Sequence, residues 1–173
     1  EKDKAKYQYV TYQKGVKEFN RGNFKNSIQY FDLSQRYQSD YNIFIKSFLN
    51  KAEAYFIGNK YKNASDEILK VYNENINSDL KIKLSLLLGY SYFNQNEYNE
   101  SSRYLNSYFN LKGNKITTSD IDPLLRLADS YYASKNFKSS INSYNKALKI
   151  SDVNKNYINY QIGLCYYGLN DFT

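Results

Sequence analysis

One aromatic position recurs along this chain at a nearly constant spacing, and that recurrence limits what the chain can fold into. Each occurrence is a phenylalanine or tyrosine that comes five residues after another aromatic residue, across a short polar stretch. Successive occurrences are separated by 37, 37, 39 and 35 residues, at Phe24, Tyr61, Tyr98, Phe137 and Phe172. A period of this length is typical of proteins in which one supersecondary unit is stacked on the next. The sequence therefore predicts a repeat architecture.

The unit is clearest in residues 124–150, where the apolar residues have the spacing of an α-helix. The first half follows the i, i+3, i+4, i+7, i+8 pattern with Leu124, Leu127, Ala128, Tyr131 and Tyr132. The second half carries a similar apolar stripe, made of Phe137, Ile141, Tyr144, Ala147 and Leu148. Residues 134–136 between them are polar and turn-prone. We therefore predict two antiparallel helices, which need neighbours of the same kind to cover their apolar faces.

Other positions recur in register with the aromatic one. Nine residues before it the side chain is always small: Gly15, Ala52, Gly89, Ala128 and Gly163. Three residues after it the side chain is again small, at Ser27, Ala64, Ser101 and Ser140. Seven residues after it the side chain is bulky, at Phe31, Ile68, Leu105 and Tyr144. We expect the small residues where two helices approach closely, and the bulky ones in the space between hairpins.

This pattern resembles the tetratricopeptide repeat, a helix–turn–helix unit of 34 residues. Two departures are the missing proline at the end of the units and Glu18 in place of an aromatic residue. The resemblance implies an all-α fold, a right-handed superhelical solenoid of antiparallel helix hairpins with four full repeats and one half repeat. It places the whole chain in one domain, with units at residues 6–40, 41–77, 78–114, 119–152 and 154–173.

The connections between helices carry further signals. Ser78 is a candidate N-cap and Gly113 a candidate C-cap, since both residue types are favoured there. Asp122 followed by Pro123 suits the N-cap and first position of the next helix. The longest break, residues 112–122, is a candidate hinge or partner-contacting loop, with a plain solvated connection as the alternative.

The last unit stops where its second helix is due. Terminal repeats normally carry a polar outer face, yet residues 154–169 are apolar around much of the expected helix. We therefore expect either that the chain is a fragment of a longer protein or that this helix docks onto another chain, forming a homo-oligomer. The single cysteine, Cys165, is expected to be a buried structural thiol.

The resemblance also implies where a partner binds. In tetratricopeptide-repeat proteins the first helices line a concave wall, and the matching positions here are largely aromatic and aliphatic. Such a surface suits a peptide or protein segment, with tyrosines supplying contact area and a polar tip. The alternative is that these side chains pack against the adjacent hairpin. The predicted binding residues are Tyr12, Phe19, Leu49, Glu53, Phe56, Leu86, Tyr90, Phe93, Asp129, Tyr132, Tyr160 and Tyr167.

Catalysis, metal binding and cofactor binding are not expected. The chain has no histidine, the commonest general base and metal ligand near neutral pH, and it has no glycine-rich phosphate loop. Glu53 and Asp129 lie in units separated by another hairpin, so they are not expected to work as an acid–base pair. No apolar run approaches the length of a membrane span. The sequence therefore predicts a non-catalytic scaffold.

Nucleic-acid binding is the alternative function. A formal charge of +7 together with 31 tyrosines and phenylalanines suits single-stranded RNA. The lysines, however, are spread along the chain without forming a stripe, and the tyrosines fall at packing positions. We therefore expect a protein partner.

The order and spacing of residue types in two stretches narrow the resemblance further. Residues 15–37 and 51–65 look like stretches of the periplasmic tetratricopeptide-repeat proteins of bacterial envelopes, such as the outer-membrane assembly lipoprotein and the Tol–Pal coordinator. This implies a scaffold in cell-envelope assembly, located in the periplasm or at the envelope, with the cytoplasm as the alternative.

Overall fold

The computed structural model describes residues 2–170, and within that range the chain is helical with no β-strand. A short 3-10 helix, Thr118–Asp120, precedes the seventh of nine α-helices. These are α1 (Lys2–Asn20), α2 (Phe24–Ser34), α3 (Tyr41–Ile57), α4 (Tyr61–Leu69), α5 (Ser78–Asn94), α6 (Tyr98–Lys112), α7 (Ile121–Ala133), α8 (Phe137–Ile150) and α9 (Lys155–Gly168). The recurring aromatic residue opens α2, α4, α6 and α8, whereas Phe172 lies outside the described residues.

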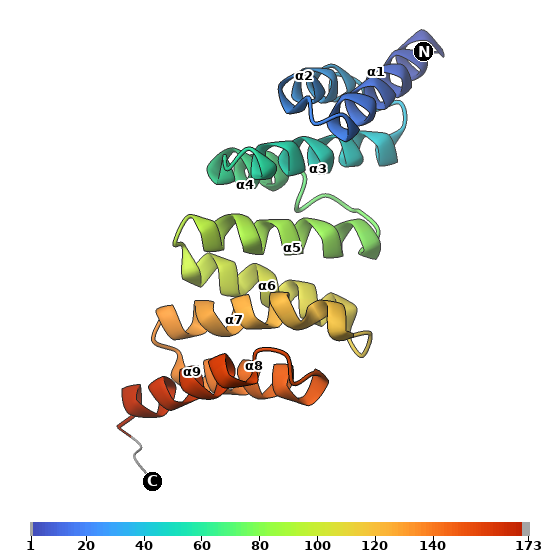
Figure 1. Cartoon of the computed structure of the whole chain (residues 1–173). Coiled ribbons are helices and arrows are strands. Elements are labelled where there is room, and N and C mark those ends of the chain that lie inside the picture. The colour runs from blue at the N-terminus through green and yellow to red at the C-terminus, as the bar shows by residue number, and fades with distance from the viewer. Residues whose placement is uncertain (1, 171–173) are drawn as a thin grey trace.

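The helices form four hairpins and one further helix, stacked in chain order (Figure 1). Each second helix packs against its own first helix and against the first helix of the next hairpin, up to the contact of α8 with α9. The two ends of the chain therefore lie at opposite ends of the stack (Figure 1). This confirms the predicted all-α solenoid of four hairpins and a half.

Each hairpin turns through one residue in the left-handed region, two residues before the recurring aromatic position. These residues have φ between 56° and 78°, and they are Gly22, Asn59, Asn96, Lys135 and Asn170. In the second turn the Asn59 and Lys60 amides donate to the carbonyls of Phe56 and Tyr55, both at 2.9 Å. This is the Schellman arrangement that ends many helices. Glycine and asparagine tolerate this backbone conformation, so most of the turns use residues suited to it.

The recurring small residues lie where the two helices of a hairpin cross. A Cβ atom on Gly15 would come within 2.6 Å of the Phe31 ring, and one on Gly89 within 2.6 Å of Leu105 Cγ. The Ser101 hydroxyl donates to the Gly89 carbonyl at 2.9 Å across the same crossing. The small residues therefore lie at close helix crossings, as predicted, whereas the bulky Phe31 and Leu105, expected between hairpins, pack within their own hairpin as well.

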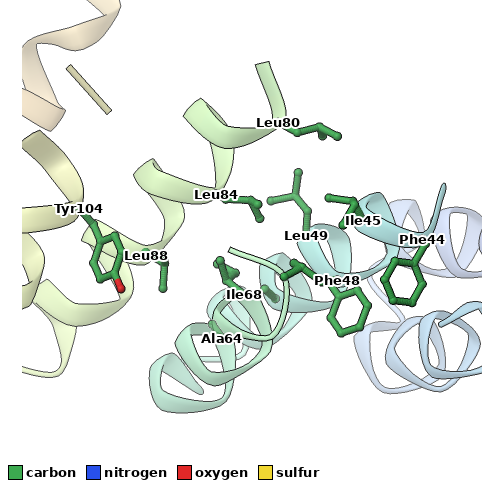
Figure 2. Packing of buried hydrophobic residues seen from close by; sticks show 12 residues of the cluster. Phe44, Ile45, Phe48, Leu49, Ala64, Ile68, Leu80, Leu84, Leu88 and Tyr104 are labelled. Atoms are coloured by element: carbon green, nitrogen blue, oxygen red, sulfur yellow. The ribbon is translucent and has the colours of Figure 1, made fainter. Parts of the chain in front are cut away.

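The apolar side chains gather in two clusters. The first joins α3 to α6 and is shown in Figure 2; it contains Phe44, Ile45, Phe48, Leu49, Ala52, Ala64, Ile68, Val71, Leu80, Leu84, Leu88 and Tyr104. The second joins α7, α8 and α9 and contains Ile121, Leu124, Leu125, Ala128, Tyr144, Ala147, Ile158 and Cys165. Cys165 is fully buried, its thiol lies 3.4 Å from the Ser140 hydroxyl, and burial raises its pKa. The expectation of a buried structural thiol is confirmed.

Residues 112–122 are fixed to the body of the protein by a buried carboxylate. Asp120 is fully buried and lies at 2.5 Å from the Tyr108 hydroxyl, 2.6 Å from Lys112 Nζ and 2.7 Å from the Thr117 amide. Gly113 ends α6 as predicted. Because α6 and this segment are joined through the Asp120 carboxylate, the segment is neither a free hinge nor a merely solvated connection.

Two predicted helix starts are wrong. Asn77, not Ser78, caps α5, and its side-chain oxygen accepts from the Leu80 amide at 2.9 Å. α7 begins at Ile121, so Asp122 is not its N-cap and Pro123 is its third residue. The preceding 3-10 turn already supplies the transition into α7, which leaves the Asp122 carboxylate to bond side chains of other residues.

Candidate functional site

The first helices of the hairpins lie side by side along the solenoid. α1 contacts α3, α3 contacts α5, and α5 contacts α7, whereas second helices make at most marginal contact with one another. The stack is therefore tighter on the side of the first helices, which makes this the inner side of its curve. We call the surface formed there by Tyr12, Glu53, Phe56, Tyr90 and Phe93 the inner face.

Four of the predicted binding residues are rings half-buried against their own hairpin. Each lies on a first helix and packs on the aromatic residue that opens the second helix, with ring centroids 5.2 to 5.7 Å apart. They are Phe19, Phe56, Phe93 and Tyr132. These rings fix the turn of the hairpin and keep part of their surface exposed on the first helix.

Leu49 does not belong to the exposed surface. Its side chain is only 4% exposed and lies among Ile45 and Leu84 in the first apolar cluster (Figure 2). Leu49 lies at the edge of the apolar stripe of α3 that faces α4 and α5, so its side chain is part of the core. Leu86, one repeat later in the same register, is only partly buried.

Arg126 and Asp122 of α7 border the inner face and contact its residue Tyr90. The Arg126 guanidinium lies 4.9 Å from the Tyr90 ring centre and 5.1 Å from that of Phe93. The Asp122 carboxylate accepts from Tyr90 Oη at 2.5 Å and from Arg126 Nε at 3.2 Å. Burial and the hydrogen bond to Asp122 raise the pKa of Tyr90, so its hydroxyl stays protonated as a donor. Because Phe56 lies 6.5 Å from Tyr90, the aromatic surface continues onto α3.

Glu53 and Tyr12 occupy the neighbouring part of the inner face, on α3 and α1. The Tyr12 hydroxyl accepts a hydrogen bond from Asn50 at 3.2 Å, and Glu53 lies one turn further along α3. Burial raises the pKa of the Glu53 carboxyl, and the positive charge of Lys83 on α5 only partly opposes this. Glu53 is thus a partly desolvated acid at the contact of three first helices.

Asp129 has a structural role. Its carboxylate accepts from Tyr144 Oη at 2.5 Å and from Tyr157 Oη at 2.7 Å, which ties α7 to α8 and α9. Burial and the hydrogen bond to Asp129 raise the pKa of Tyr157 to about 12. The two remaining predicted residues, Tyr160 and Tyr167, are 64% and 70% exposed on α9.

The sequence interpretation missed Arg126 and Asn50. The signal for Arg126 was present, because Asp122 stands four residues earlier, a spacing that places both side chains on one face of a helix. Asn50 has no such local sign, since its partner Tyr12 belongs to the preceding hairpin.

Other features of the described residues show no sign of a reactive centre. No group of three or more cysteine, aspartate or glutamate side chains is placed to hold a metal ion in residues 2–170. Over the same range, none of the helices has the length and apolar character needed to cross a bilayer. A hollow of about 610 Å³ beside Lys4 and Arg36, and another of about 380 Å³ between α6 and α8, lie away from the inner face.

Comparisons with known proteins agree with the fold. Residues 121–154 match the family model described as tetratricopeptide repeat, and they contain α7 and α8. A crystal structure of MamA protein is 18% identical, with a TM-score of 0.75 over 96% of this chain and 85% of that one. A MamA AMB-1 structure is 16% identical, with a TM-score of 0.72 over 95% and 83% of the two chains. A MamA MSR-1 structure is 17% identical, with a TM-score of 0.71 over 95% and 87%. A sequence search of curated proteins gives no significant match.

Helical solenoids of this class use their extended concave surfaces to bind other proteins. The observed solenoid and the matched repeat together therefore indicate a protein-interaction module. Residues 121–154 match the tetratricopeptide-repeat model, and the described residues of the chain fold as a tetratricopeptide-like helical solenoid.

Proposed function

We propose that this protein is an adaptor that binds a peptide or protein segment along its inner face. The observation that carries the proposal is the row of rings from Phe56 through Tyr90 to Phe93, with Arg126 laid across the last two. These residues come from three consecutive first helices and are all partly exposed. One bound segment can therefore contact several repeats at once.

The chemistry of this row suits an apolar or amphipathic segment. Aromatic rings provide large contact areas at a low entropic cost, and tyrosine and arginine add hydrogen bonds at the edge. The rings and the guanidinium are already held by Asp122 and by neighbouring rings, so little order has to be created on binding.

The proposal is tested by selecting peptides from a displayed random library on the immobilised protein. We expect the selected peptides to lose about tenfold or more in affinity for Tyr90→Ala and Arg126→Ala, since central aromatic and arginine residues dominate interfaces. Leu69→Ala is the control, because Leu69 is 39% exposed on α4, a second helix. If circular dichroism shows that Tyr90→Ala folds and the peptides bind it unchanged, the site lies elsewhere.

Single-stranded RNA is the alternative ligand, favoured by the net charge of +7. The inner face opposes it, because Glu53 and Asp122 place carboxylates beside the rings on which bases would have to stack. We therefore expect a labelled oligonucleotide to show no salt-sensitive binding at micromolar protein. Binding that weakens steeply with salt would favour the RNA reading.

We also propose that α9 is a second contact surface, through which copies of the chain associate. On this helix Tyr160 is 64% exposed and Tyr166 is 42% exposed. Its main packing contact is with α8. Gel filtration with light scattering is expected to show a concentration-dependent rise in mass that Tyr160→Lys abolishes. A constant monomer mass up to high concentration would contradict this.

For the location, we propose the bacterial cell envelope, with a scaffold role in its assembly. The support is the order and spacing of residue types in residues 15–37 and 51–65, which resemble those of periplasmic tetratricopeptide-repeat proteins. Fractionation of cells that express the natural gene with a C-terminal tag is expected to place the protein with periplasmic or membrane markers. Recovery with cytoplasmic markers would contradict the proposal.

A further inference from the structure

Glu53 stands at the point of the inner face where three first helices meet. On α3 it shares one face with Asn50 and Phe56, which lie three residues before and after it. α1 lies on one side of α3 and supplies Tyr12, which Asn50 holds at 3.2 Å. α5 lies on the other side and supplies Tyr90, whose ring is 6.5 Å from that of Phe56. The carboxylate is therefore set among aromatic side chains from three repeats.

This carboxylate has no hydrogen bond or ion pair with any residue of the range 2–170. Other partly or fully buried acids of the chain are satisfied. Asp129 accepts from two tyrosines, Glu67 pairs with Lys51 at 2.9 Å and Lys70 at 2.6 Å, and Asp120 pairs with Lys112. The charge of Lys83 acts on Glu53, but the two side chains do not form an ion pair. Glu53 thus differs from these other buried carboxylates, each of which has a hydrogen-bond or ion-pair partner.

The partial burial of this carboxylate has an energetic cost. Burial of a carboxylate disfavours its charged form, and here that effect exceeds the attraction of Lys83, so the pKa of Glu53 is raised. Burial also raises the pKa of Tyr12, the hydrogen bond from Asn50 opposes this, and the negative charge of Glu53 adds to the rise. A ligand that brings a positive charge to this place would recover the energy lost by desolvation.

The surroundings select the kind of cation. Rings of tyrosine and phenylalanine attract ammonium and guanidinium groups and can also cover the apolar stem of a lysine or arginine. A metal ion is excluded by ligand number, because hard divalent cations take about six oxygen ligands and Glu53 is a lone carboxylate.

We propose that Glu53 receives one lysine or arginine side chain of the bound segment, between the rings of Tyr12, Phe56 and Tyr90. This inference rests on the proposed binding of a segment at the inner face. The net charge of +7 repels strongly basic partners at long range, so the segment is neutral or acidic apart from this one cation.

The test uses peptides selected on the immobilised chain as above, with Glu53→Gln as the variant. Glutamine keeps the shape and removes the charge, and this variant is expected to fold and to be more stable than the wild type at pH 7. We expect its affinity for the selected peptides to fall about tenfold. Replacement of the single lysine or arginine in the peptide by glutamine should cause the same loss in the wild type and almost none in the variant.

Glu97→Gln is the matched control, because Glu97 is exposed at the start of α6 and makes no side-chain cap. NMR titration of Glu53 gives a second readout: its pKa should fall when a lysine-containing peptide binds and stay unchanged with the glutamine peptide. Peptides that depend on Tyr90 but bind Glu53→Gln at full strength would overturn this inference and leave the proposed function standing. Binding of lysine amide alone at equal strength would also overturn it, since the segment would then be unnecessary. Absence of any peptide that depends on Tyr90 would overturn the proposed function itself.

Discussion

At the scale of the residue, glycine at one position of the repeat is required in some units and not in another. Gly15 and Gly89 occupy closed crossings, where an added Cβ atom would lie 2.6 Å from a bulky side chain of the second helix. Gly163, in the same register on α9, has no atom within 4 Å of that position. The repeat pattern assigns one residue type to all three places, but only the closed crossings require it.

Gly89→Ala is therefore expected to destabilise the protein by about 1–3 kcal/mol, the usual cost of forcing extra volume into a packed site. Leu105 and the backbone near it would have to move. Gly163→Ala is the control, and it should stabilise α9 by up to about 1 kcal/mol through helix propensity. Urea denaturation measures both. Equal effects of the two substitutions would show that the crossing is not tight.

At the scale of the element, the turns between helices reuse one backbone conformation with different residues. Four of the five recurring turn residues with positive φ are glycine or asparagine, and the fourth turn carries Lys135 with φ of 60°. The conformation is imposed there by two hydrogen bonds, from the Lys135 and Asn136 amides to the carbonyls of Tyr132 and Tyr131. The turn between α7 and α8 therefore holds its geometry against the preference of its own residue.

Lys135→Gly is expected to stabilise the protein by about 1 kcal/mol, since glycine avoids the strain of a left-handed residue with a Cβ atom. The exposed Lys135 side chain makes no hydrogen bond or ion pair with residues 2–170, so the exchange removes none. The free energy of unfolding from thermal or urea melts gives the measurement. The reverse change, Asn59→Lys in the second turn, should cost a similar amount, and a stable Asn59→Lys protein would contradict the explanation.

The segment that links α6 to α7 depends on a charge. Burial alone would raise the pKa of Asp120, but hydrogen bonds from Lys112, Tyr108 and the Thr117 amide outweigh it and lower the pKa. The folded carboxyl therefore binds its proton more weakly than the unfolded one. The resulting stability is fully present above the unfolded value of about 3.9 and is lost as the pH falls through the lowered pKa of the folded state.

We expect Asp120→Asn to cost about 2–4 kcal/mol at pH 7, because Lys112 and Tyr108 lose their charged partner. The difference from the wild type should shrink as the pH is lowered below about 4. Urea melts between pH 3 and 7 test this, with the exposed Asp152→Asn as control. A difference that stays constant over this range would show that the carboxylate charge is not responsible.

At the scale of the whole molecule, the sequence was sufficient for the repeat and insufficient for the details of the inner face. The repeat period, the helix hairpins and the small residues at the helix crossings follow from local patterns that recur along the chain. The burial of Leu49 could not be read in this way, because one stripe of α3 serves both the core and the surface. The hydrogen bonds from Asn50 to Tyr12 and from Lys112 to Asp120 join separate elements. No local sequence pattern predicts them. The unit boundaries stay a prediction.

A stack of this kind is not uniformly stable. α3 contacts α1, α2, α4 and α5, whereas α9 has α8 as its main neighbour. Native-state hydrogen exchange is therefore expected to be fastest in α9 and slowest in α3 and α5, because stability in solenoids depends on adjacent contacts. Selected peptides should slow exchange in α3, α5 and α7. Exchange at one common rate in all helices would show that the chain opens only as a whole.

The one-sided contact between first helices also has a mechanical consequence. Neighbouring first helices touch each other directly, whereas the second helices of neighbouring hairpins are linked through the first helix that lies between them. A side chain inserted between two first helices would spread the inner side of the stack and flatten its curve. We therefore expect a ligand bound at Glu53 to change the distance between α1 and α9.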